Sequence, residues 1–233
     1  PSVTMINMSN KNFRIGLLSS AMQKANITPL FHIISILSSI STSIYLITGN
    51  EGYLSFKNDP RIHTTGVTCR LGKYRVANIF KYVYRQFLNA YYLIRTSKNV
   101  DVWIFFLGGD CMVLPMLAAK LLNKSVVLVL TGSAVNDAKF THDIFYIPIK
   151  LMSSINYAFS NHIVLYSPCL VQEWNLEKYR HKILIAQRHF LDFEAFNVIN
   201  SLPDRPPLVG YIGRLSGEKG VQHFAKALPA ILS

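Results

Sequence analysis

Glycines and cations near the carboxyl end of the chain have the types and spacing to bind a diphosphate. Residues 208–212 form an apolar run of the length typical of a buried strand, and Gly213 follows it. Arg214 and Lys219 lie in the loop, and Ser216 could cap a helix after it. Free N–H groups at a helix start favour an anion, and Arg and Lys both bind phosphate oxygens. The spacing therefore predicts a strand, a glycine loop and a helix that hold a diphosphate.

The loop also carries a resemblance to a known family. Residues 213–220 read Gly-Arg-Leu-Ser-Gly-Glu-Lys-Gly. This run resembles the Gly-Arg-Leu-x-x-x-Lys-Gly element of glycosyltransferase family 4, whose GT-B fold consists of two facing Rossmann-like domains. The resemblance implies that Gly213, Arg214 and Lys219 bind the diphosphate of a UDP- or GDP-sugar substrate, with no cofactor and no metal. The alternative is a surface Arg and Lys beside an ordinary strand-to-helix turn.

Two earlier glycine turns could also contact a ligand. One follows the apolar run 101–107, and the other follows the apolar run 126–130. Strand ends in a doubly wound sheet point into the crevice where ligands bind, although either turn could be a plain connection. Gly16, inside the first predicted strand, is a further candidate. The expected cleft residues of the two turns are Gly108, Gly109, Asp110, Thr131, Gly132 and Ser133.

The second turn bears on catalysis. Many family 4 enzymes carry His-Gly at this strand end, and the His reaches the donor sugar or the reaction centre. Thr131 stands in the His position here, and a hydroxyl can hydrogen-bond a sugar but cannot carry a positive charge. The catalytic residues are therefore unknown. No Gly-x-Gly-x-x-Gly follows the first strand, which argues against NAD or FAD.

A basic amphipathic helix is predicted over residues 74–96. It lies in a segment, 66–100, that contains seven cations and no acid. One interpretation is a core helix with a solvated basic face, and the other is a helix that contacts an anionic membrane. The membrane-contact candidates are Lys73, Arg75, Lys81 and Arg85. The apolar stripe of the helix consists of Val76, Ile79, Phe80, Val83, Phe87, Ala90, Tyr91 and Ile94.

These residues need a framework of alternating strands and helices. The alternation over residues 1–196 predicts an α/β fold, a doubly wound parallel sheet covered on both faces. The resemblance implies a Rossmann-like acceptor-side domain over 1–200, a linker over 201–206 and the start of a donor-binding domain over 207–233. That last segment has 27 residues, and Pro229 is expected to end or kink its helix. We therefore expect a fragment that is inactive by itself.

Residues 25–50 contain no formal charge and are long enough to span a bilayer. Pro29, His32 and the polar residues 38–43 interrupt the segment. We expect a helix over 28–40 and a strand over 43–47 in a soluble core instead.

The composition favours an anionic partner and gives no sign of a metal site. The chain has 233 residues, a net charge of +12 and three scattered cysteines without metal-ligand spacing. Residues 1–100 carry 12 Lys and Arg against 2 acids, which favours an anionic partner. No signal-peptide pattern is present. We expect a cytoplasmic protein, either free or attached peripherally to the inner face of the cell membrane.

Two functions remain open, and a third is not supported. The resemblance implies a retaining glycosyltransferase of the hexosyltransferase type, which transfers a sugar to a glycan or lipid-linked acceptor in cell-surface polysaccharide or glycolipid biosynthesis. The alternative is a non-catalytic Rossmann-type subunit that docks a partner or an anionic membrane. No nucleic acid is expected as a partner, since the sequence has no RNP-like, helix-turn-helix or zinc pattern.

Overall fold

The structure is a computed structural model, and it describes residues 13–24, 27–68, 72–186, 201–206, 208–213, 215 and 217–232. The chain divides into two compact units, residues 1–188 and 189–233, which are taken separately below. The predicted boundaries of a domain over 1–200 and a linker over 201–206 stay predictions.

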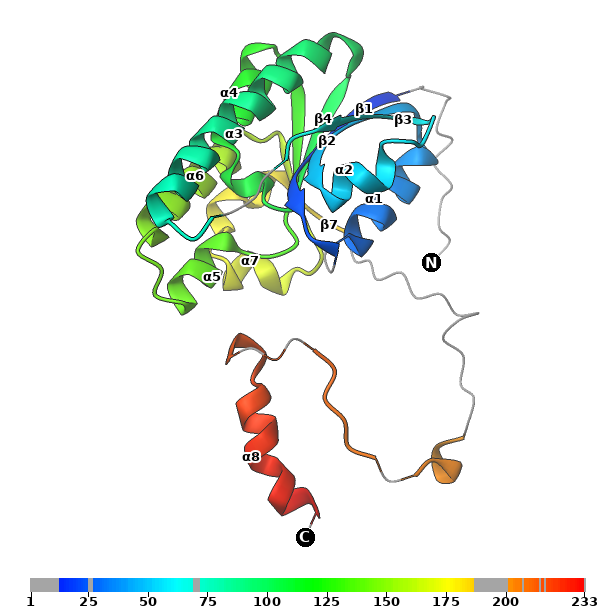
Figure 1. Cartoon of the computed structure of the whole chain (residues 1–233), viewed down its shortest axis with the longest axis vertical. Helices are drawn as coiled ribbons and strands as arrows, with labels where there is room; N and C mark the ends of the chain where they lie inside the picture. Colours follow the sequence, from blue (N-terminus) through cyan, green and yellow to red (C-terminus); the bar gives the residue numbers. More distant parts are fainter. Residues whose placement is uncertain are drawn as a thin grey trace. The chain divides into compact units, whose positions relative to one another are not determined.

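The first unit contains a seven-stranded parallel sheet in the order β3-β2-β1-β4-β5-β6-β7 (Figure 1). The sequence order reverses between β1 and β4, which is the arrangement of a doubly wound Rossmann-like fold. The predicted α/β fold is confirmed. The strands are β1 Phe13–Met22, β2 Ser41–Asn50, β3 Ile62–Gly66, β4 Val102–Phe106, β5 Ser125–Val129, β6 His162–Leu165 and β7 Ile183–Ile185.

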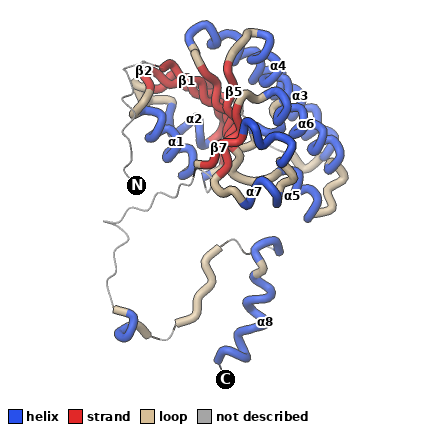
Figure 2. The backbone as a smooth tube through the Cα atoms, turned by 180° about the vertical axis from the view of Figure 1, so that it is seen from behind, coloured by secondary structure: helices blue, strands red, loops and turns tan. Residues whose placement is uncertain are grey.

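Helices cover both faces of this sheet (Figures 1 and 2). α1 and α2 pack on one face with Ile15, Leu17 and Phe106, whereas α3, α4 and α6 pack on the other with Trp103 and Phe105. α5 packs against α6. The helices of this unit are α1 Thr28–Ser38, α2 Glu51–Phe56, α3 Arg75–Thr96, α4 Val113–Leu121, α5 Ala134–Phe140, α6 Tyr146–Phe159 and α7 Cys169–Glu173.

The uncharged segment folds as a helix and a strand, as predicted. α1 and β2 together occupy most of residues 28–50, and Leu30, Ile34 and Leu46 pack in one core. Among the described residues, no helix is both long enough and apolar enough to cross a membrane.

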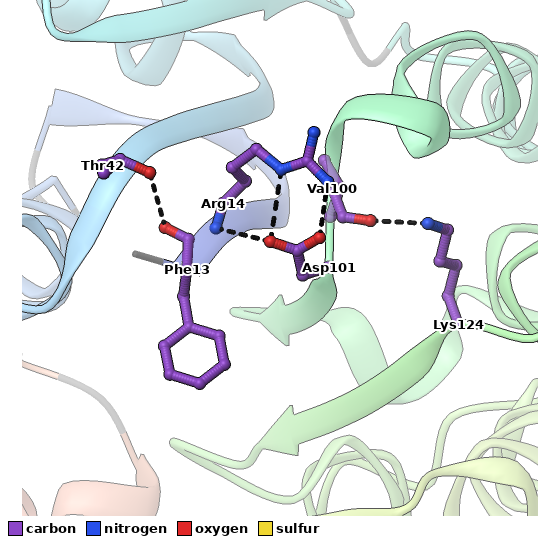
Figure 3. Close-up of polar contacts among 6 residues, drawn as sticks. All are labelled: Phe13, Arg14, Thr42, Val100, Asp101 and Lys124. Carbon is purple, nitrogen blue, oxygen red and sulfur yellow. Dashed lines mark hydrogen bonds and ion pairs between the residues drawn. The ribbon is translucent and has the colours of Figure 1, made fainter. Parts of the chain in front are cut away.

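An ion pair holds the starts of two central strands together (Figure 3). Arg14 Nη2 lies 2.7 Å from Asp101 Oδ1, and Arg14 Nε donates to Asp101 Oδ2. Hydrogen bonds from Arg14 lower the pKa of the Asp101 carboxyl group. The pair thus adds an exposed contact between β1 and β4 at the edge where these strands begin. Figure 3 also shows Thr42 donating to the Phe13 carbonyl and Lys124 donating to the Val100 carbonyl.

Two helices of the first unit were not predicted. α2 begins immediately after β2, in a stretch for which no helix is predicted above. Asn50 has φ +52°, and this conformation lets the chain pass from strand to helix without a longer loop. α5 occupies a stretch that the sequence prediction left unassigned. Both helices are short, so their apolar periodicity is weak.

The second unit differs from the prediction. The predicted strand over 208–212 is wrong: these residues form no strand, and Leu208 and Ile212 are exposed. A strand needs a paired neighbour, and no strand occurs in the parts of 201–232 that the structure describes. α8 Val221–Leu232 is present, and Pro229 lies inside it rather than at its end.

Candidate functional site

The candidate site lies at the carboxyl edge of the sheet, where the strand order reverses between β1 and β4. The pairing of β1 with β4 ends at Ser19 and Phe106, and the loop after β4 begins at Leu107. The Ser20 amide donates to the Leu107 carbonyl at 3.0 Å, so β1 also contacts the start of this loop. This edge is where a doubly wound sheet binds its ligands.

The backbone at the end of β4 is strained. Leu107 has φ +42°, a conformation that a bulky residue rarely adopts, and Gly108 follows with φ +85°. A Cβ atom on Gly108 would lie 3.2 Å from Ser20 Cβ. Both the conformation and the space at position 108 therefore favour glycine. Such strain concentrates at functional sites, which makes this turn the strongest cleft candidate in the unit.

Asp110 lies inside this loop and is only 5% exposed. Burial raises its pKa to about 6, against the opposing effect of hydrogen bonds from its own amide and from the amide of Ala134. Its Oδ2 atom is buried and finds no hydrogen-bond partner in the described part of the chain. A buried carboxylate with an unpaired oxygen destabilises the fold, so its presence at a ligand-binding edge favours a functional role.

Two helices anchor the loop from outside. Asn156 of α6 donates to the Gly109 carbonyl at 2.8 Å, and Gln86 of α3 donates to the Cys111 carbonyl at 2.7 Å. The Gln86 side-chain carbonyl accepts from the Leu114 amide, and Tyr82 also donates to the Cys111 carbonyl. These bonds satisfy buried polar groups and couple α3 and α6 to the end of β4.

The turn after β5 is more open. Ser133 caps α5 because its Oγ accepts from the Asn136 amide at 3.1 Å. Thr131 and Gly132 are exposed, and a Cβ atom on Gly132 would contact nothing within 4 Å. β4 and β5 pair in parallel up to Phe106 and Val129, so the turns that follow them start side by side at the same edge of the sheet. The structure therefore brings the two predicted turns together.

Gly16 is not part of this group. It lies inside β1, paired with Tyr45 and Trp103 of the neighbouring strands. A Cβ atom there would lie only 2.4 Å from Trp103 Cε3. Gly16 thus makes room for a buried indole in the core, and the structure places it away from the strand ends.

Hydroxyl groups at the same edge were missed by the sequence prediction. Ser19 donates to Thr48 Oγ1 at 2.8 Å, and both residues are buried. Ser20 faces Gly108 across the strand-order reversal. The available signal was that a hydroxyl residue follows each of two apolar runs, at Ser19 and Thr48.

The predicted diphosphate loop lies in the second unit. Gly213 and Lys219 are described and exposed, whereas Arg214 and Ser216 lie outside the described residues. Tyr211 donates to the Lys219 carbonyl at 3.4 Å, and Gly220 has φ +70° immediately before α8. The binding roles of Gly213, Arg214 and Lys219 stay predictions.

The apolar stripe of α3 faces outward. Every residue of the stripe except Ala90 is exposed, and Phe80 is 72% exposed. The side chains buried under this helix are Gln86, Asn89 and Leu93. The interpretation of the stripe as core is therefore wrong, because the polar anchors of the β4 loop occupy the inward face. Among the membrane-contact candidates, Lys73, Arg75 and Lys81 are exposed and Arg85 is partly buried.

A groove of about 840 Å³ lies between α3 and the segment from α5 into α6. Its floor includes Tyr82 and Cys111, so it adjoins the loop at the end of β4. In the described part of the chain, no cluster of three or more His, Cys, Asp or Glu residues could hold a metal ion.

Comparisons with known proteins agree on the architecture. No protein-family model and no curated protein matches the chain. LpCGTa in complex with UDP is 12% identical, with a TM-score of 0.57 over 89% of this chain and 61% of that chain. UGT89C1 of Arabidopsis thaliana complexed with UDP-L-rhamnose is 11% identical, with a TM-score of 0.56 over 93% of this chain and 63% of that chain. This chain thus spans less than two thirds of either protein.

The likeness shows the fold alone. It is the Rossmann-like α/β architecture of GT-B proteins, and it matches the seven-stranded sheet described above. Membership of glycosyltransferase family 4 in particular stays a prediction.

Proposed function

We propose that this chain is part of a GT-B glycosyltransferase that transfers a sugar from a UDP- or GDP-sugar to a glycan or lipid-linked acceptor. The observation that carries the proposal is the Gly-Arg-Leu-x-x-x-Lys-Gly run at residues 213–220. This run follows, in the sequence, a Rossmann-like unit whose backbone is strained at the carboxyl edge of its sheet. Two proteins of similar fold were solved with UDP and with UDP-L-rhamnose, which supports a nucleotide sugar as the donor class.

In this proposal the second unit binds the diphosphate of the donor and the first unit binds the acceptor. Arg214 and Lys219 stabilise the negative charge that develops on the departing diphosphate, and two such cations remove the need for a metal ion. The strand ends of the first unit receive the acceptor, with hydroxyl groups at Ser20 and Thr131 as hydrogen-bonding partners for a sugar or alcohol. Retention of anomeric configuration follows from the resemblance and is tested by NMR of the product.

The proposal also includes peripheral contact with the inner face of an anionic membrane. The exposed stripe of α3 supplies apolar side chains, and Lys73, Arg75 and Lys81 supply positive charge beside it. Helices of this kind bind anionic membrane surfaces through both contributions. A lipid-linked acceptor would be presented at such a surface.

The test uses the protein as its gene encodes it, incubated with labelled UDP- and GDP-sugars and a lipid extract of the source cell. We expect labelled product and release of the free nucleoside diphosphate, UDP or GDP. Nucleotide-sugar binding without transfer would favour the alternative, a non-catalytic binding subunit. The absence of both binding and transfer would contradict the proposal.

A further inference from the structure

The groove beside α3 has mainly apolar walls. Ile79 and Val83 of α3 form one wall, and Pro148, Ile149 and Met152 of α6 form the other. A volume of about 840 Å³ lies within the range of small-molecule sites. Such a groove favours a hydrocarbon over a polar ligand.

The polar side chains on the floor of the groove are uncharged, and the Tyr82 hydroxyl group is already hydrogen-bonded within the protein. Tyr82 donates its hydroxyl proton to the Cys111 carbonyl, and burial raises the pKa of the Tyr82 hydroxyl group. Burial also raises the pKa of the Cys111 thiol to about 12, so the thiol stays neutral. The floor therefore carries no charge at neutral pH.

The end of the groove at the start of α3 is positively charged. Arg75 lines the groove, and Lys73 lies two residues earlier. The first turn of α3 contains no acid and no side-chain cap, so its N–H groups add a partial positive charge. Asp143 is the only acid among the lining residues, and its Oδ1 accepts from the Phe145 amide. An anionic group beside Arg75 is therefore favoured.

The groove is continuous with the apolar surface that the proposed membrane contact uses. Ile79 and Val83 belong to both the groove and the exposed stripe of α3. Ile144, on the opposite rim, is 70% exposed. A hydrocarbon chain could therefore pass from a bilayer into the groove without crossing a polar surface.

The groove also lies at the ligand-binding end of the unit. Cys111, on its floor, follows Asp110 in the loop at the end of β4, and the same loop is held by Gln86 of α3. The floor of the groove therefore adjoins the strand ends that are proposed to receive the acceptor.

We propose that this groove binds the hydrocarbon chain of an anionic lipid acceptor, while Arg75 binds the phosphate of its head group. The role of the lipid as an acceptor rests on the proposed function, but the binding of the lipid does not depend on sugar transfer. It is therefore measured without any sugar donor.

The probe is decyl phosphate below its critical micelle concentration, titrated into the full chain and followed by isothermal titration calorimetry. Two reference titrations separate chain from head group: inorganic phosphate and decyl maltoside. We expect saturable one-to-one binding of decyl phosphate, binding of decyl maltoside at least tenfold weaker, and no binding of inorganic phosphate over the same concentrations. Equal binding of decyl phosphate and decyl maltoside would overturn the role of Arg75.

Paired variants locate the site. Ile149→Gln should weaken decyl phosphate binding at least tenfold, whereas Leu151→Gln, an exposed position on the same helix outside the groove, should leave it unchanged. Arg75→Gln should weaken it similarly, and Arg95→Gln, near the other end of α3, should not. Equal effects within either pair would overturn the proposal.

A filling variant covers the case in which Ile149→Gln lowers the melting temperature. Val83 is exposed, so Val83→Trp should fold and block the groove, with Tyr84→Trp as the control outside it. Undiminished binding in Val83→Trp would overturn the assignment. A dimer in sedimentation velocity together with no decyl phosphate binding would assign the groove to a second copy of this chain. If the wild-type protein does not bind decyl phosphate but still transfers sugar from a nucleotide sugar, the lipid groove is rejected and the proposed function stands.

Discussion

Asp110 combines burial, an unpaired oxygen and a position at the strand-order reversal. A carboxyl group whose pKa is raised on folding binds protons more tightly in the folded state. Its contribution to stability is therefore present below the unfolded pKa, near 4, and is lost as the pH rises through about 6. At neutral pH the charged group destabilises the fold.

The first prediction is that Asp110→Asn stabilises the protein at pH 7.5 by up to about 3 kcal/mol, the equivalent of a shift of about two pKa units. At pH 4 the variant and the wild type should be nearly equal. Urea unfolding at four pH values between 4 and 7.5 measures this, with Glu173→Gln as the exposed control. Parallel pH profiles for Asp110→Asn and the wild type would contradict the raised pKa.

Gly108 has a positive φ, and a Cβ atom there would lie tightly against Ser20. The second prediction is that Gly108→Ala lowers the free energy of unfolding by about 1–2 kcal/mol, because a Cβ atom meets Ser20 and a positive φ is strained. Gly132→Ala is the matched control, since its Cβ atom would contact nothing nearby. Chemical denaturation of both variants is the measurement, and equal stabilities would show that the turn tolerates a side chain.

At the scale of elements, α3 exposes its large apolar side chains to solvent and buries the side-chain amides of Gln86 and Asn89 against the rest of the unit. Gln86 and Asn89 are buried, while Phe80 and Phe87 are exposed. The inward Gln86 side chain binds the loop at the end of β4, and the outward apolar side chains are available to a surface. The helix therefore links a candidate membrane contact to the candidate acceptor edge.

The third prediction is that residues 1–233 co-sediment with anionic vesicles, not with neutral ones, and that high salt abolishes the binding. Each cation near an anionic surface contributes about 1 kcal/mol at most, and salt screens it, so weak attachment is expected. Lys81→Glu with Arg85→Glu should weaken binding, and so should Phe80→Ser. Glu173→Gln should leave it unchanged. Equal behaviour on both vesicle types would reduce α3 to a helix with a solvated face.

At the scale of the molecule, regular alternation of strands and helices made the fold predictable. Dense apolar runs such as β4 and β5 have few alternatives to a buried parallel strand. α2 and α5 escaped prediction because helices of 6 and 7 residues show little periodicity. The run at 208–212 was predicted as a strand from composition alone, although a strand also needs neighbours to pair with.

The candidate site was predictable only in part. The glycine turns at 108–109 and 131–133 end apolar runs, so sequence alone pointed to them. Their anchors were not visible, since Gln86 and Asn156 are 25 and 47 residues away from the carbonyls that they bind. The outward orientation of the apolar stripe of α3 could not be predicted for the same reason, because the groups that bind its polar face lie on other elements.

The central claim is that the chain uses a nucleotide-sugar donor through the loop at residues 213–220. The measurement is kcat/KM for sugar transfer in the protein as its gene encodes it, with Arg214→Ala and Lys219→Ala against Lys226→Ala, a control cation on α8. Loss of one preorganised charge donor lowers rates by about 10² or more elsewhere. We therefore predict a loss of about 100-fold or more in each of the two loop variants and near-normal transfer in Lys226→Ala. Near-normal transfer in both loop variants would contradict the account.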